Sequence, residues 1–221
     1  MTSKAKRKAI AARILGVALI AAGIALVLPP LYSEVIETQI QSGQQSQQAD
    51  QLSRLLDTKA VKAPAKNEPF AVIYIPRLGS DFRRPIAEGT GVKEVLNTVG
   101  IGHYVGTAMP NEVGNFALAS HRTTHGGAFN HIDTLVEGDS IYVEFAGGWT
   151  TYQVVATQVV TPNEIWVIGS NPLKQTADKW ITLTTCTPRY TSEKRLVVWA
   201  KQTDFITHND GPPAALAASL H

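Results

Sequence analysis

The sequence predicts a mainly β domain, a closed or nearly closed barrel with short helices, that follows an N-terminal membrane-spanning helix and a polar stalk. Three observations lead to this prediction. Short β-branched and aromatic runs alternate with Gly and Pro turn signals from residue 69 to residue 206. One long uncharged run lies near the N-terminus, and a segment rich in Gln and Ser follows it. A barrel suits many short strands because closure removes exposed sheet edges.

The first 33 residues have the composition of a membrane anchor. Residues 1–13 contain five Lys or Arg and no acidic residue, and residues 14–33 contain no charged residue. A run of ~20 apolar residues can span a bilayer. Because Glu34 and Glu37 follow it, the charge bias predicts a cytoplasmic segment 1–13, a single-pass anchor 14–33 and an extracellular remainder. A cleaved signal peptide is the alternative, but the uncharged run 14–33 is longer than the apolar region of a typical signal peptide.

Residues 34–68 are predicted to form an extracellular stalk and linker. Apolar residues recur at spacings compatible with a helix, while Gly43 and the polar run around it interrupt the pattern. We expect one or two exposed helices, coiled or single, before a flexible linker at 62–66, with simple disorder as the alternative. Beyond residue 13 the chain has 15 basic and 18 acidic residues, so the formal charge falls from +2 to −3. This balance argues against a nucleic-acid partner.

The domain from 69 to 206 divides into strands, short helices and turns. Strands are predicted at 70–75, 116–120, 140–146, 149–160, 180–185 and 196–199, and short helical segments at 92–99, 129–135 and 171–179. The pair Gly147-Gly148 allows positive φ and predicts a hairpin turn. After residue 206, an Asn-Asp-Gly-Pro-Pro segment and an Ala-rich end predict a disordered tail, 207–221.

The only cysteine, Cys186, follows the predicted strand 180–185 and precedes a turn that begins at Pro188. A thiol attacks as its thiolate, and an ordinary cysteine, with a pKa of ~8.5, is mostly protonated at neutral pH, so it needs a cationic neighbour. Arg195 begins the returning strand, and a hairpin would place it beside Cys186. Its guanidinium stays charged and can stabilise a thiolate environment or a developing oxyanion. A buried structural cysteine is the alternative.

Among six histidines, His121 is the best candidate for general acid and base catalysis because it follows an apolar strand and precedes a polar loop. Position alone gives it only a modest preference over His103 or His125. His121 and His125 have the spacing of two zinc ligands on a helix. However, Gly126 and Gly127 disfavour a helix, and the glutamate of a zinc-protease motif is absent from this stretch. We therefore expect no metal site and no cofactor.

Two segments together resemble the sortase family, the cysteine transpeptidases of Gram-positive cell surfaces. One is Thr182-Leu-Thr-Thr-Cys186 with Arg195 nine positions later, and the other is Asn115-Phe-Ala-Leu-Ala-Ser-His121. The resemblance implies an eight-stranded barrel and a catalytic set of His121, Cys186 and Arg195. It also implies a sorting-signal peptide, cut between Thr and Gly, and an amine acceptor from a cell-wall precursor or a pilin. A cysteine peptidase that uses water and a non-catalytic binding module are the alternatives.

Within the family, the loop at Gly102-His103-Tyr104 and the following Gly106-Thr-Ala-Met-Pro110 are similar to class E sortases, with class D as the rival. This resemblance implies that Tyr104 favours Leu-Ala-x-Thr-Gly over Leu-Pro-x-Thr-Gly signals. Alanine has a backbone N–H for a tyrosine hydroxyl to accept, whereas proline has none. Packing on the barrel is the alternative role for Tyr104. The other predicted substrate contacts are Ser120, Thr184 and Thr185, of which Thr184 shares a strand face with Cys186.

Overall fold

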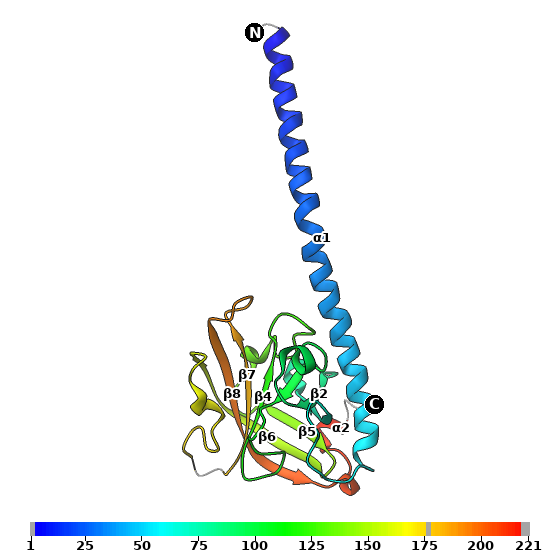
Figure 1. Cartoon of the computed structure of the whole chain (residues 1–221), viewed down its shortest axis with the longest axis vertical. Helices are drawn as coiled ribbons and strands as arrows, with labels where there is room; N and C mark the ends of the chain where they lie inside the picture. Colours follow the sequence, from blue (N-terminus) through cyan, green and yellow to red (C-terminus); the bar gives the residue numbers. More distant parts are fainter. Residues whose placement is uncertain (1–2, 176–177, 218–221) are drawn as a thin grey trace.

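Eight strands close into a barrel in the order β1-β2-β3-β4-β7-β8-β6-β5. A computed structural model describes residues 3–175 and 178–217 (Figure 1). The strands are β1 (Pro69–Tyr74), β2 (Arg83–Glu88), β3 (Ile101–His103), β4 (Gly114–Ser120), β5 (Ser140–Phe145), β6 (Gly148–Val160), β7 (Lys179–Thr187) and β8 (Lys194–Ile206). The prediction of an eight-stranded barrel with short helices is confirmed.

Parallel pairing of β4 with β7 and antiparallel pairing of β7 with β8 bring three distant segments together on one wall of the barrel. Both predicted hairpins form. In the β5–β6 hairpin, Gly148 has φ +133°, and a Cβ there would lie 2.2 Å from the carbonyl oxygen of Ile206. Only glycine fits this turn, because a side chain would meet both an unfavourable φ and the neighbouring backbone.

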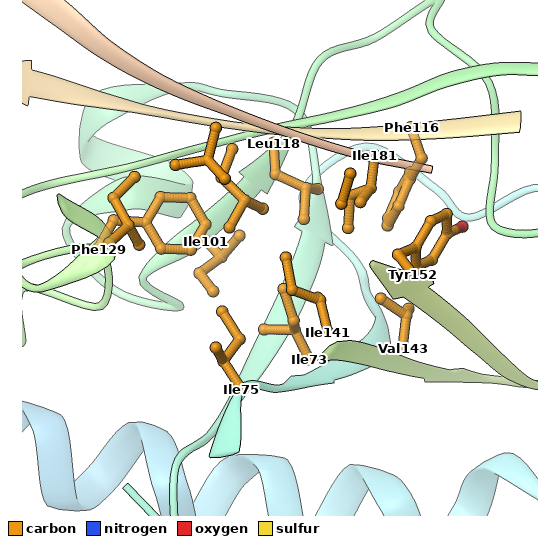
Figure 2. Packing of buried hydrophobic residues seen from close by; sticks show 14 of the residues in the cluster. Ile73, Ile75, Ile101, Phe116, Leu118, Phe129, Ile141, Val143, Tyr152 and Ile181 are labelled. Atoms are coloured by element: carbon orange, nitrogen blue, oxygen red, sulfur yellow. The ribbon is translucent and has the colours of Figure 1, made fainter. Parts of the chain in front are cut away.

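The barrel interior is filled by aliphatic and aromatic side chains that alternate along the strands. Ile73, Phe116, Leu118, Ile141 and Ile181 are fully buried and point into this core (Figure 2). Their alternation with outward-facing residues follows from the two-residue period of a strand. A second buried cluster, around Trp180 and Trp199, packs on the outside of β7 and β8. The wall that carries the site is therefore packed on both faces.

Two of the three predicted short helices have a counterpart in the structure, at 92–96 and 132–134, and two further turns, at 76–78 and 165–168, were not predicted as helical. A π-helical turn spans Val92–Leu96, and 3-10 turns span Pro76–Leu78, Ile132–Thr134 and Ile165–Ile168. The predicted helix at 171–179 differs from the structure, whose described residues in this segment form bends and turns before β7 begins at Lys179. In place of helical pairing, the Asn171 side chain bonds the main chain of Gln175 at both its amide nitrogen and its oxygen. Asparagine competes with helix formation in this way.

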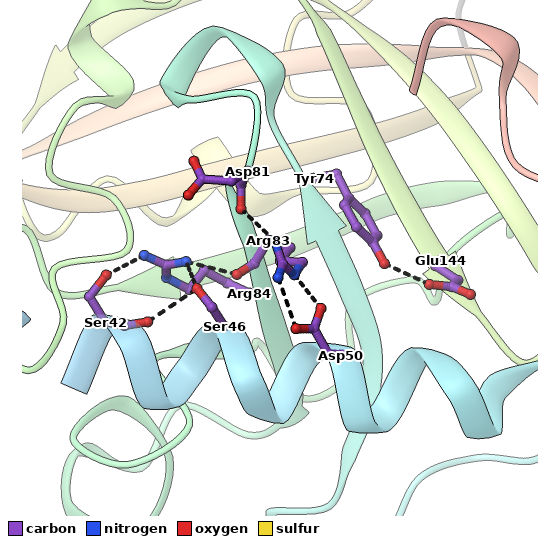
Figure 3. Close-up of polar contacts among 8 residues, drawn as sticks. All are labelled: Ser42, Ser46, Asp50, Tyr74, Asp81, Arg83, Arg84 and Glu144. Atoms are coloured by element: carbon purple, nitrogen blue, oxygen red, sulfur yellow. Dashed lines mark hydrogen bonds and ion pairs between the residues drawn. The ribbon is translucent and has the colours of Figure 1, made fainter. Parts of the chain in front are cut away.

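Helix α1 (Ser3–Leu56) runs without a break through the predicted anchor and stalk. Gly43 does not end it, since one glycine in a helix interior costs only about 1 kcal/mol. The structure differs from the expected exposed stalk because the last third of α1 packs on the barrel, where Gln45, Ala49 and Leu56 are buried. Asp50 forms an ion pair with Arg83 of β2 (Figure 3). The docking face of α1 consists largely of small and polar residues, so the apolar pattern of the sequence did not predict it.

The segment after β8 also differs from the predicted disorder. A 3-10 turn at His208–Asp210 leads to the short helix α2 (Ala214–Ala217), and residues 218–221 lie outside the described part. Leu216 is buried in a cluster that contains Ala49 and Leu56 of α1 and Trp149 of β6. Leu216 is a single apolar residue in a polar, Ala-rich segment, so no apolar pattern predicted this contact.

One helical stretch, Ile10–Leu28, is long and apolar enough to cross a membrane, and its described side chains are exposed. Its 19 residues extend for about 28 Å at 1.5 Å per residue, close to the thickness of a bilayer core. A signal sequence near the N-terminus would meet the same criterion.

Docking of α1 on the barrel can be tested with two adjacent leucines. Leu56 is fully buried and Leu55 is 57% exposed. We expect Leu56→Ala to lower the free energy of unfolding by about 2–5 kcal/mol, because it opens a cavity in the α1–barrel contact. Leu55→Ala should change it by less than about 0.5 kcal/mol. Chemical denaturation of the full chain in detergent measures both, and equal effects would contradict the docking.

Candidate active site

The strand register brings His121, Cys186 and Arg195 to one end of the barrel. Along the parallel β4–β7 pair, Ala119 lies opposite Thr184, so the same register places His121 level with Cys186. On the other side of β7, Cys186 is the direct partner of Arg195 in β8. Side chains of paired residues share a face of the sheet. The three residues predicted to be catalytic therefore lie across three adjacent strands.

A pocket of about 440 Å³ opens at this end and contains both His121 and Cys186. Its wall comes from the loop after β4, from the β7–β8 turn and from α1, through Glu34. Cys186 is partly exposed. Arg195 lies at the edge, where its Nη1 donates to the carbonyl oxygens of Ser192 and Lys194 at 3.0 Å each. The thiol and the imidazole thus line one pocket, and Arg195 is the strand partner of Cys186.

Asn97, which the sequence analysis did not single out, fixes the orientation of the histidine. Its Oδ1 lies 2.8 Å from Nε2 of His121. An amide oxygen only accepts, so Nε2 carries a proton, and in the neutral imidazole Nδ1 is the atom that gains one. Asn97 follows the turn Val92–Leu96, 24 positions before His121. No local sequence signal could have revealed a contact over that separation.

His125 packs against His121 and alters its acidity. The two rings lie 5.0 Å apart between centroids and are tilted by 33°. Burial lowers the pKa of His121, and the charge of His125 lowers it further. His121 is therefore largely neutral at pH 7 and can accept a proton there. The residues between the two rings form a loop, so they do not adopt the helical spacing of a zinc pair.

Arg122, directly after His121, connects the histidine loop to the cysteine strand. Its side chain is 7% exposed, its Nη1 donates to Oγ1 of Thr187 at 2.8 Å, and its Nη2 lies 2.9 Å from a carboxylate oxygen of Asp133. Thr187 is the residue after Cys186. A buried arginine with two such partners holds the ends of β4 and β7 at a fixed separation. The sequence motif contained this residue, but its role depends on side chains from three segments.

Comparison with known proteins agrees with this geometry. Residues 73–203 match the sortase domain family. Sortase SrtE1 of Streptomyces coelicolor is 38% identical over 95% of this chain, and the match spans 62% of that protein's length. Sortase SrtE2 of the same organism is 32% identical over 93% of this chain and 88% of its own length. The crystal structure of Streptomyces coelicolor sortase E1 with a tripeptide in its active site superposes with a TM-score of 0.63, at 39% identity, over 70% of this chain and 99% of that chain.

The chain belongs to the sortase family. The matched region begins in β1 and ends in β8, so it includes the whole wall that carries His121, Cys186 and Arg195. Sortases are cysteine transpeptidases, and the similarity to sortases of class E confirms the subclass that the Tyr104 loop suggested.

In this sortase, Tyr104 contacts the cysteine strand through Thr184. The Tyr104 hydroxyl lies 3.0 Å from Oγ1 of Thr184, which in turn donates to the carbonyl oxygen of Leu118 at 3.0 Å. Because Thr184 has a single O–H, it accepts from Tyr104 and donates to Leu118. The lone pairs of the tyrosine oxygen are then left as acceptors, two residues along β7 from Cys186.

Ser120 and Thr185 are engaged within the barrel wall of the sortase. Ser120 donates to the carbonyl oxygen of Gly100 at 2.7 Å, and Thr185 donates to that of Ser120 at 2.8 Å. Both side chains are buried. These hydroxyls fasten β4 to its neighbours, and their contact with substrate stays a prediction.

The effect of His125 on His121 can be measured directly. We expect His125→Asn to raise the pKa of His121, because it removes the neighbouring charge that lowers this pKa. The measurement is an NMR pH titration of ¹⁵N-histidine-labelled full chain in detergent micelles. His131→Asn, at an exposed position, serves as the control and should leave the His121 titration unchanged. An unchanged titration in His125→Asn would show that burial alone sets this pKa.

Proposed function

We propose that this sortase is a membrane-anchored transpeptidase that cleaves a sorting signal between Thr and Gly and joins the new acyl group to an amine of the cell wall or of a pilin. The observation that supports it most strongly is the alignment of His121, Cys186 and Arg195 across β4, β7 and β8, with two of them in one pocket. The tripeptide in the active site of the Streptomyces coelicolor sortase E1 supports a peptide as the ligand.

In the proposed reaction, neutral His121 takes the thiol proton of Cys186, the resulting thiolate attacks the Thr carbonyl carbon, and the C–N bond to Gly breaks. His121 gives its proton to the departing amine, and a thioester remains on Cys186. An acceptor amine then attacks the thioester, His121 takes the proton of that amine, and the thiolate leaves. Arg195 exchanges its two main-chain acceptors for the substrate oxygen on which negative charge develops.

Selection of the signal is assigned to Tyr104. Its hydroxyl donates to Thr184 and keeps acceptor lone pairs on the face of β7 that also carries Cys186. A Leu-Ala signal can donate its alanine N–H to that oxygen, whereas a Leu-Pro signal has no donor at this position. Leu-Ala-x-Thr-Gly is therefore the proposed signal.

The direction of α1 supports reaction close to the membrane. The β7–β8 turn lies at the end of the barrel from which α1 extends towards its N-terminus (Figure 1). Glu34, six residues after the apolar stretch Ile10–Leu28, lines the pocket of Cys186. Those six residues correspond to about 9 Å of helix. With the N-terminus inside, as the charge bias predicts, the pocket would meet signals and amine acceptors at the outer surface.

The transpeptidase proposal is tested with the full chain in detergent, a Leu-Ala-x-Thr-Gly peptide and a glycine-type amine. We expect a ligated product by mass spectrometry and none from Cys186→Ala. His121→Ala should lower kcat/KM by roughly 10²–10⁴-fold through loss of acid and base catalysis. Arg195→Ala should lower it by roughly 10²–10³-fold through loss of oxyanion stabilisation.

Lys194→Ala is the matched control for Arg195→Ala, since it removes an exposed cation from the preceding position. It should retain wild-type activity. A product of hydrolysis that does not change with added amine would instead support a cysteine peptidase. Absence of both products from a folded chain would overturn the proposed signal.

Tyr104→Phe tests the choice of signal. Removing one hydrogen bond of about 0.5–1.5 kcal/mol should lower kcat/KM for the Leu-Ala peptide by roughly 3- to 10-fold. The Leu-Pro peptide is the internal control, because it has no N–H to lose, and its rate should stay within about twofold. Equal losses for the two peptides would assign Tyr104 a packing role.

A further inference from the structure

Gln45 is the single buried member of the run Gln44-Gln45-Ser46-Gln47-Gln48 in α1. Its side chain is 2% exposed, whereas Gln44, Gln47 and Gln48 are exposed. Burying a carboxamide costs free energy unless it is hydrogen-bonded. Its Nε2 donates to the carbonyl oxygen of His125 at 3.0 Å, while its buried Oε1 has no hydrogen-bond partner among the described residues. The helix that carries the predicted anchor thus places one polar group into the loop next to His121.

Gly100 and Gly126 leave the space that the carboxamide of Gln45 occupies. A Cβ added at Gly100 would lie 2.6 Å from Nε2 of Gln45, and one added at Gly126 would lie 2.6 Å from its Oε1. Both glycines have positive φ, +103° and +81°. The carboxamide therefore lies between the backbones of two loops. A side chain at either glycine would clash with it.

Both loops contact the catalytic histidine strand. The first carries Asn97, which bonds Nε2 of His121, and ends at Gly100, whose carbonyl oxygen accepts from Ser120. The second carries His125, whose ring packs on His121. The carboxamide of Gln45 lies between the loops that hold the imidazole from its two sides.

The position of Gln45 is itself fixed by polar residues on an adjacent row of the same helix. Ser42 and Ser46 accept hydrogen bonds from Arg84, and Asp50 pairs with Arg83 (Figure 3). These residues lie three, one and five positions from Gln45. Since directional bonds on both sides hold the helix in register, the carboxamide cannot slide along the two loops without breaking them.

We propose that Gln45 is a positioning residue for His121, through which the helix of the membrane anchor holds the two loops that orient the catalytic imidazole. The proposal rests on the proposed function, since it takes His121 as the acid and base. It assigns part of the catalytic support to α1, outside the barrel. A sortase in which α1 leaves the barrel would lose the arrangement of its histidine while keeping Cys186 in β7.

The test uses the full chain in phospholipid nanodiscs. Gln45→Ala removes the carboxamide, and Gln45→Met keeps most of the bulk without a donor. Gln44→Ala and Gln47→Ala are matched controls at exposed positions of the same helix. We expect both Gln45 variants to lower kcat by roughly tenfold to a hundredfold through misplacement of a catalytic group, with KM within about twofold. Both controls should match the wild type.

A second readout is independent of peptide turnover. Cys186 is the only thiol in the chain, so the pH dependence of its alkylation by iodoacetamide reports on the site alone. The titratable and charged groups around it are His121, Arg122, His125, Glu34, Tyr190 and Arg195. The midpoint should move in both Gln45 variants and stay at the wild-type pH in the controls. Thermal unfolding should show folded protein in all four variants.

The outcomes separate the two proposals. Wild-type kcat and a wild-type alkylation midpoint in Gln45→Ala would overturn the positioning role. Wild-type behaviour in Gln45→Met alone would show that bulk suffices and would overturn the role of the carboxamide. If the wild type ligates neither peptide, the proposed function fails, while a midpoint shift confined to the Gln45 variants would still support the link between α1 and the site.

Discussion

Parallel pairing of β4 with β7 is the constraint on which the site depends. These strands are separated by 65 positions in the chain, yet they run in the same direction with Gly114 opposite Lys179. Parallel strands end at the same edge of a sheet, so the residues that follow β4 and end β7 meet there. The β7–β8 hairpin then adds Arg195 opposite Cys186. Closure of the barrel around a filled core keeps this wall from shifting in register.

A shell of hydrogen bonds converts this coarse placement into a defined arrangement. The register sets the backbone position of His121. Asn97 selects its tautomer, and burial, together with the charge of His125, lowers its pKa. Arg122 adds the separation between the ends of β4 and β7. Reactivity falls steeply when a catalytic group is misplaced by an ångström, so such a shell contributes to rate as well as to stability.

The sequence predicted the barrel and singled out the candidate reactive residues because both have local signals, with the sortase resemblance separating His121 from the other histidines. β-branched runs mark the strands, and strand ends mark His121 and Cys186. The support around them could not be predicted, since Asn97 and Gln45 act across separations of 24 and 80 positions. The docking of α1 on the barrel was not predicted for a related reason. Its buried face includes Gln45 and Ala49, so a search for apolar periodicity finds little there.

The polar character of that face also explains why α1 docks in one position. Arg84 is buried, which lowers its pKa to about 10, and it remains charged at neutral pH. A buried guanidinium is stable only with acceptors, and here Ser46, Ser42 and the carbonyl oxygen of Arg83 provide them. Ser42, Ser46 and Asp50 recur every four residues, so a slide of α1 by one turn would still bring a polar side chain to Arg84, but it would move Asp50 away from its partner Arg83. An apolar interface would tolerate that slide. The distance between the apolar stretch and the pocket is therefore set by directional bonds from α1 to two adjacent arginines, Arg83 and Arg84.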